Sequence, residues 1–257
     1  MKDKLLLVLN GAEERVQIVL ARGGSLVLHQ EWAAPARVMR FLVPALEHAL
    51  SMLELRMRDV SGIACVRGPG NFTGLRLCLA TTYGLAMGAG LPMAGLDYMP
   101  ALAAGPGPML HGRLAVLTHA RSNQVNCQLF RVPDMTPLSQ PETLALDDPS
   151  SLEPLLDSAA DTAAGPLHVL GSGVRRNLAA LQALLPQARF LDSSWDNPRP
   201  EVLIRQTLAV RFSFDPVEPL YLRPCDAEEN LEVFAAKRGI SPLEARDRLR
   251  VAMEGET

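Results

Sequence analysis

The residues with the clearest chemical potential form a glycine-rich loop, Gly68–Gly74, placed between a short apolar run and a longer apolar segment. Glycines let backbone amides approach a ligand, and the first turn of a helix offers unpaired N–H groups that attract anions. The spacing lacks the Lys-Ser/Thr of a P-loop and misses the dinucleotide-binding fingerprint by one position. The loop therefore predicts either a phosphate site or a tight strand-to-helix turn capped by Asn71 or Thr73.

Other catalytic patterns are weak. The five histidines form neither H-E-x-x-H nor H-x-x-x-H, and the four cysteines form no C-x-x-C pair, so we expect no metal site and buried free thiols. Gly171-Ser172-Gly173 is too short for a nucleophile elbow and is interpreted as a loop. His119-Ala120-Arg121 follows an expected strand, where α/β proteins place ligand-contacting groups, although an exposed loop arginine is the alternative.

Composition limits the function further. The net charge of the 257 residues is −3, which excludes the basic surface of a protein that binds nucleic acid unaided. The N-terminal apolar run, Leu5–Leu9, is too short for a signal peptide or a membrane span. We expect a soluble, cytoplasmic protein with a mostly aliphatic core.

Apolar periodicity and turn residues predict the elements that hold the loop. Two long helices are expected at about 35–53 and 73–88, and a third at about 175–185. Strands are expected at 5–9, 16–20, 25–32, 62–66, 114–118, 125–130 and 167–170. On the second helix Cys78, Thr81, Gly84 and Gly88 form a small-residue face, which indicates close packing against either this protein's own sheet or another molecule.

Gly105-Pro106-Gly107-Pro108 divides the sequence into two halves, each opening with strands. Two helix-start signatures, at Asp226 and Ser241, indicate a C-terminal helical hairpin. We predict a first subdomain at 1–104, a second at 105–225 and the hairpin at 226–257.

The run Gly68-Pro69-Gly70-Asn71-Phe72-Thr73-Gly74-Leu75-Arg76 resembles the signature of the TsaB (YeaZ) family, also described as glycoprotease-like or peptidase family M22. Gly171-Ser172-Gly173 and Leu220-Tyr221-Leu222-Arg223-Pro224 are similar to further family segments. The resemblance extends over residues 4–224 and has no counterpart for the hairpin. It marks as the family loop Gly68, Gly70, Asn71, Thr73, Gly74 and Arg76.

The resemblance implies an α/β fold of the actin-like ATPase (ASKHA), ribonuclease H-like type, with two related mixed-sheet subdomains. It implies a non-catalytic scaffold or dimerisation subunit that supports TsaD, the transferase that makes N6-threonylcarbamoyladenosine (t6A) at position 37 of tRNA. Other implied partners are a TsaE-like ATPase and a second copy of the chain, with tRNA contacted only through the complex and no membrane. No cofactor is implied in this subunit itself, and ATP or ADP would bind at most at an interface of the complex.

Family members pair with TsaD through their first two long helices, and they form homodimers through much the same surface. The resemblance therefore implies a largely apolar surface on helices 35–53 and 73–88. Its candidate contacts are Met39, Val43, Leu46, Leu75, Leu79 and Tyr83.

Three departures from the relatives affect the alternatives. Asn10-Gly11 stands where relatives show Asp-Thr, which removes a carboxylate near a metal and phosphate. Val38 and Met39 stand where TsaD-type relatives carry metal-binding histidines, and His119 replaces the Asp of Asp-Ala-Arg. A nucleotide-binding or hydrolysing enzyme is the second hypothesis, weakened by Asn10, and a peptidase is the third.

Overall fold

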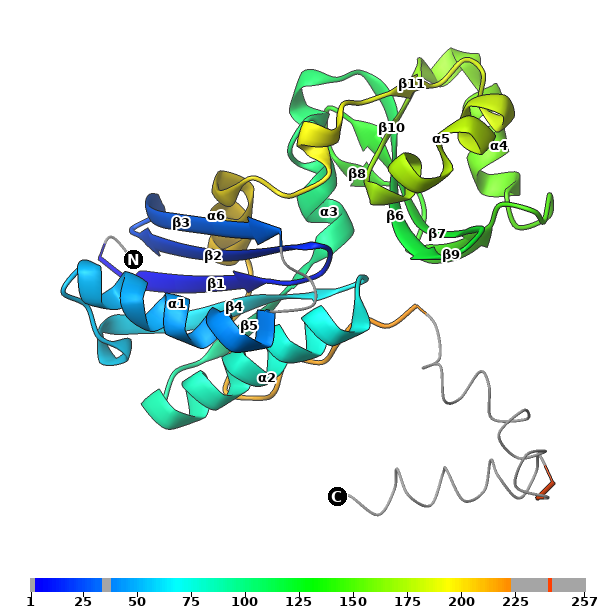
Figure 1. Ribbon diagram of the computed structural model, residues 1–257. Coiled ribbons are helices and arrows are strands. Elements are labelled where there is room, and N and C mark those ends of the chain that lie inside the picture. The colour runs from blue at the N-terminus through cyan, green and yellow to red at the C-terminus, as the bar shows by residue number, and fades with distance from the viewer. Residues whose placement is uncertain (1–2, 34–37, 223–239, 242–257) are drawn as a thin grey trace. The chain divides into compact units, whose positions relative to one another are not determined.

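The computed structural model describes residues 3–33, 38–222 and 240–241, and residues 1–220 form one compact unit that contains two β-sheets (Figure 1). The strands are β1 Leu5–Asn10, β2 Arg15–Arg22, β3 Ser25–Ala33, β4 Val60–Gly68, β5 Met93–Asp97, β6 Gly112–Arg121, β7 Gln124–Val132, β8 Thr136–Pro137, β9 Glu142–Ala145, β10 Leu167–Leu170 and β11 Arg189–Phe190. The α-helices are α1 Val38–Met52, α2 Phe72–Ala89, α3 Tyr98–Ala103, α4 Glu153–Ala160, α5 Ser172–Leu184 and α6 Pro200–Ala209. Short 3-10 helices are η1 Met57–Asp59, η2 Gly107–Met109, η3 Thr162–Ala164 and η4 Ser193–Trp195.

The first sheet has the strand order β3-β2-β1-β4-β5. β1, β2 and β3 form an antiparallel meander, whereas β4 pairs in parallel with both β1 and β5. β1 is central, and all six of its residues are buried. A strand covered on both faces needs a continuous apolar run rather than alternation, which explains the sequence Leu5-Leu6-Leu7-Val8-Leu9.

Helices α1 and α2 lie on the same face of the first sheet (Figure 1). Leu42, Leu46 and Leu50 of α1 join Cys78 and Ala86 of α2 in one core with alternate side chains of β1 and β2. Residues spaced by three or four share one side of a helix, so each helix buries a single stripe against the sheet.

The opposite face of the first sheet packs against α3 and α6. The segment that contains α6 follows the second sheet in sequence, yet its contacts are with β1, β2, β3 and β5. The second predicted segment, 105–225, therefore contributes a helix to the first sheet, which a division into consecutive segments does not capture. The boundaries at 104/105 and 225/226 stay a prediction.

The second sheet repeats the topology of the first. β6 pairs antiparallel with β7 and parallel with β10, β10 pairs in parallel with β11, and β7 also pairs with β8 and β9. Helices α4 and α5 pack on one face. Each sheet is a meander followed by two parallel strands, which confirms the predicted α/β fold of two related, ribonuclease H-like mixed-sheet subdomains.

Every strand and long helix expected within the described residues is present, with ends within a few residues of the prediction. The first long helix is described from Val38, because residues 34–37 lie outside the described part. The predicted hairpin at 226–257 also lies outside it, except for residues 240–241. Among the described helices, none is both long and apolar enough to cross a bilayer.

Candidate functional site

The loop Gly68–Gly74 joins β4 to α2 as a capped turn. The Oδ1 atom of Asn71 accepts hydrogen bonds from the backbone N–H groups of Thr73 at 3.0 Å and Gly74 at 3.2 Å. Of the two predicted caps, Asn71 is therefore the one used, and Thr73 lies in the first helical turn. Two of the N–H groups that an anion would need are already bonded to this side chain.

The glycines of the loop allow it to pack on the β1–β2 turn. The N–H group of Asn71 donates to the carbonyl of Ala12 at 2.5 Å. A Cβ atom at Gly70 would collide with the same carbonyl, and one at Gly74 would collide with the carbonyl of Gly11. These two glycines are needed for the close packing of the two backbones. Gly68 has a φ of +123° and lies against the backbone of Leu220.

An exposed stripe runs along α2 from the family loop. Phe72, Arg76, Ala80, Tyr83 and Met87 are exposed and are spaced by three or four residues, which places them on one side of the helix. The guanidinium of Arg76 lies 3.9 Å from the centre of the Phe72 ring. Tyr83 is 44 % exposed and Met87 is 61 % exposed, so large apolar side chains face outward within the described chain.

Packing within the described part of the chain does not account for two of the small residues on α2. Gly84 and Gly88 are exposed, and a Cβ atom at either position would meet no atom within 4 Å among the described residues. Cys78, in contrast, is fully buried. The predicted packing of a small-residue face against the protein's own sheet is therefore wrong for the two glycines.

The structure corrects part of the predicted contact set. Leu46 and Leu75 are 2 % and 0 % exposed and belong to the core, so they cannot be surface contacts in this structure. Leu79 is partly buried against that core, and Val43 and Tyr83 are exposed. Met39 lies in α1, and its side chain is outside the described part of the structure. Sequence spacing identified the two helices but did not distinguish their inner and outer faces.

Asn10 is buried at the end of β1, and both ends of its side-chain amide are hydrogen-bonded. Its Nδ2 atom donates to Oε1 of Gln17 at 2.8 Å, and its Oδ1 atom accepts from the N–H group of Ala12 at 3.0 Å. Gln17 in turn donates to Glu31 and to the carbonyl of Pro198. The Asn10 amide thus links the end of β1 to β2 and to the backbone of the β1–β2 turn.

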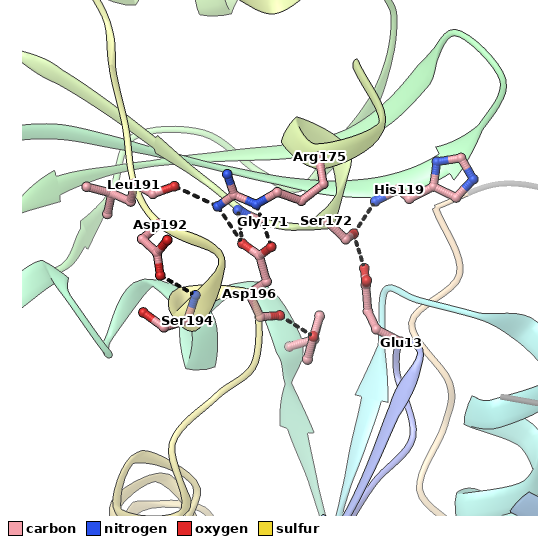
Figure 2. A network of polar contacts seen from close by, with 10 residues as sticks. Glu13, His119, Gly171, Ser172, Arg175, Leu191, Asp192, Ser194 and Asp196 are labelled. Carbon is pink, nitrogen blue, oxygen red and sulfur yellow. Dashed lines mark hydrogen bonds and ion pairs between the residues drawn. The ribbon is translucent and has the colours of Figure 1, made fainter. Parts of the chain in front are cut away.

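A polar network that sequence reasoning missed connects this turn to α5 (Figure 2). Ser172 donates from Oγ to Oε1 of Glu13 at 2.7 Å and accepts from the backbone N–H group of His119 at 2.9 Å. Gly171-Ser172-Gly173 is therefore not simply a loop, since Ser172 and Gly173 begin α5. Glu13 lies 159 positions from Ser172, so no local pattern could have paired them.

The titratable groups of this network are perturbed. Burial raises the pKa of Glu13 from 4.5 to about 7, opposed by the hydrogen bond from Ser172, while the nearby Asp196 carboxylate raises it further. Burial, together with the Arg176 guanidinium, lowers the pKa of the His119 imidazole. Arg121 is exposed at the end of β6.

Cys65, Cys78 and Cys127 are buried free thiols, as expected for those three, and Cys225 lies outside the described residues. Burial raises the pKa of Cys65 to about 11 and those of the other two still higher. Over the described positions, no three His, Cys, Asp or Glu side chains gather where they could hold a metal ion.

Residues 34–137 match the family model described as TsaD, tRNA N6-adenosine threonylcarbamoyltransferase. The TsaB protein of Escherichia coli K12, described as a tRNA threonylcarbamoyladenosine biosynthesis protein, is 32 % identical over 100 residues, which cover 39 % of this chain. The Haemophilus influenzae TsaB protein is 32 % identical over 103 residues, covering 40 % of this chain. In both cases the match spans only 43 % of the relative's length.

The similarity in fold to a solved structure extends over more of this chain than the sequence similarity to the two TsaB proteins. YeaZ from Pseudomonas aeruginosa superposes with a TM-score of 0.68 and 21 % identity, covering 85 % of this chain and 100 % of that structure. The two repeated mixed sheets thus define an α/β protein of the ribonuclease H-like type, whose fold is shared with YeaZ. The chain is thus similar in sequence to TsaB proteins over part of their length, and it shares its fold with YeaZ.

Proposed function

We propose that this protein acts in t6A biosynthesis as a non-catalytic subunit that binds a TsaD-like transferase through the exposed side of α2 and the neighbouring part of α1. The similarity to TsaB proteins, which are named for tRNA threonylcarbamoyladenosine biosynthesis, supports a role in this pathway. In this proposal tRNA is reached through the complex, a TsaE-like ATPase joins it, and the free protein forms homodimers by the same surface in the cytoplasm.

The observation that carries the proposal is the unburied stripe of α2. Phe72, Tyr83 and Met87 are large, apolar and exposed, and Gly84 leaves room for a close neighbour. Contiguous apolar residues of this kind are typical of protein interfaces, where aromatic, Met and Arg side chains are enriched. The stacked Phe72 and Arg76 pair supplies an aromatic and an arginine side chain at one end of the stripe.

The alternative, a nucleotide-binding enzyme, finds less support in the loop. The N–H groups of Asn71, Thr73 and Gly74 donate within the chain, and Gly70 and Gly74 pack against the β1–β2 turn. A phosphate would have to displace these contacts. Calorimetric titration with ATP and magnesium separates the two functions, because tight magnesium-dependent binding by the free protein would favour the enzyme.

The interface is tested with Tyr83→Asp and Met87→Asp. A carboxylate on the stripe would be desolvated in the complex without a partner, so we expect each variant to bind the same organism's TsaD-like subunit at least about tenfold more weakly. Affinity is measured by calorimetry, and t6A in tRNA is measured in cells that carry each variant.

Leu178→Asp is the matched control. Leu178 is an exposed leucine on α5, which packs on the second sheet, so the substitution places the same carboxylate on the surface but away from α2. We expect it to leave binding and t6A unchanged. Wild-type affinity in both α2 variants, with normal t6A levels, would exclude this surface as the binding site.

A further inference from the structure

Side chains of the β1–β2 turn, in the first sheet, contact side chains at the start of α5, which packs on the second sheet (Figure 2). Glu13 accepts from Ser172, and Glu14 pairs with Arg176 one turn further along α5. The partners are separated by 159 and 162 positions in the sequence. These contacts therefore join two segments that are far apart in the sequence and that pack with different sheets.

Asp196 anchors the α5 side of this contact. Its carboxylate accepts from the N–H group of Gly171 at 3.1 Å and pairs with Arg175 at 2.8 Å. Asp196 belongs to the segment that leads from the second sheet back to α6, and its carbonyl accepts from the hydroxyl of Tyr98, the first residue of α3. The two chain segments that connect the sheets thus meet at Asp196. The charge of the Asp196 carboxylate also raises the pKa of Glu13.

The β1–β2 turn also contacts the start of α2. Ala12, next to Glu13, accepts the hydrogen bond from Asn71, the cap of α2. Gly74 packs on the carbonyl of Gly11 with no space for a side chain. A movement of the turn away from α5 would therefore displace the first turn of α2.

We propose that the Glu13–Ser172 contact is a titratable clasp, which binds the first sheet to α5 most tightly when Glu13 carries a proton and which links this closure to the start of α2. This inference does not depend on the proposed function, since it concerns the free protein.

The charges around Glu13 give the direction of the pH dependence. Glu14 on the turn and Asp196 disfavour the ionised form, whereas Arg176 and the Ser172 hydroxyl on α5 favour it. Burial is the largest effect and raises the pKa to about 7, while a Glu13 exposed by opening would return to 4.5. The closed form therefore binds the proton more tightly. Between the pKa values of the open and closed forms, the closed form becomes less favourable as the pH rises. Above the higher pKa, the balance between the two forms no longer depends on pH.

The test is amide hydrogen exchange of residues 10–14 and 171–176 in the full chain, corrected for intrinsic exchange rates, at several pH values between 5 and 8. Linkage with pKa values of 4.5 and about 7 predicts a closed-to-open ratio about tenfold higher at pH 6 than at pH 8. We expect Glu13→Gln to abolish this dependence, and Ser172→Ala to move its midpoint to higher pH because the hydrogen bond that favours ionisation is removed.

Two controls isolate Glu13. Glu14→Gln removes the neighbouring carboxylate and its pair with Arg176, and His119→Asn removes the imidazole next to Ser172. Both variants should keep a pH dependence in this range. The clasp is refuted if the wild type shows no change in protection between pH 6 and 8, or if Glu13→Gln retains the wild-type profile.

Discussion

Asn10 shows how the hydrogen bonds around one buried residue decide which side chain can occupy it. Both ends of its amide are bonded, to Gln17 and to the backbone of Ala12. Gln17 uses its own amide nitrogen for Glu31 and Pro198, so only its carbonyl oxygen is available to Asn10. The position therefore requires a donor, which a carboxylate does not supply.

We predict that Asn10→Asp lowers the free energy of unfolding at pH 7 by about 2 kcal/mol, because a buried carboxylate would face the oxygen of Gln17. Part of this loss should be regained at acidic pH, where a protonated carboxyl group can donate. Urea unfolding at pH 7 and pH 5 measures both effects. Gln187→Glu, the same chemical change at an exposed position, should leave stability nearly unaltered. Equal effects of the two substitutions would contradict the role assigned to Asn10.

At the scale of elements, the contact between the family loop and the β1–β2 turn depends on glycine at Gly70. We predict that Gly70→Ala destabilises the protein by about 2 to 3 kcal/mol, because the added Cβ atom would collide with the backbone of Ala12. The same change at Gly84, in the open middle of α2, should instead stabilise the helix by up to about 1 kcal/mol. Thermal unfolding of both variants checks the contrast, and a harmless Gly70→Ala would show that the loop can move away from the turn.

The elements that were predictable are those that carry their own signal. The strand Leu167–Leu170 was predicted with its observed ends, and Asn71 was one of two predicted caps for α2. The short β5 was not predicted, and neither was α6, although Pro200 in its first turn is typical of helix starts and Val202 and Leu203 are buried. Which side of α1 and α2 is buried depends on the sheet beneath them. The Glu13–Ser172 contact depends on the whole topology, and neither is encoded in local spacing.

At the scale of the whole unit of residues 1–220, the two sheets share one apolar core. Val8 and Val66 from the first sheet lie in the same cluster as Val116 and Phe130 from the second, together with residues of α3 and α6. Separating the sheets would expose this cluster to water, at roughly 25 cal/mol per Å² of apolar surface. The repeated topology therefore does not imply two independently stable folding units.

We predict that both sheets unfold in a single transition. Trp32, on β3, reports on the first sheet in a Trp195→Phe variant. Phe190→Trp, on β11, reports on the second sheet in a variant with Trp32 and Trp195 both replaced by phenylalanine. The substitutions can themselves shift the urea midpoint of each variant, so each midpoint is first corrected for the change in stability that they cause. Because the shared core is lost when either sheet unfolds, the two corrected midpoints should coincide. The wild-type protein, followed by circular dichroism and by calorimetry, provides the control for perturbation by the reporters. Corrected midpoints that differ by more than about 0.5 M urea would mean that the sheets unfold separately despite the core between them.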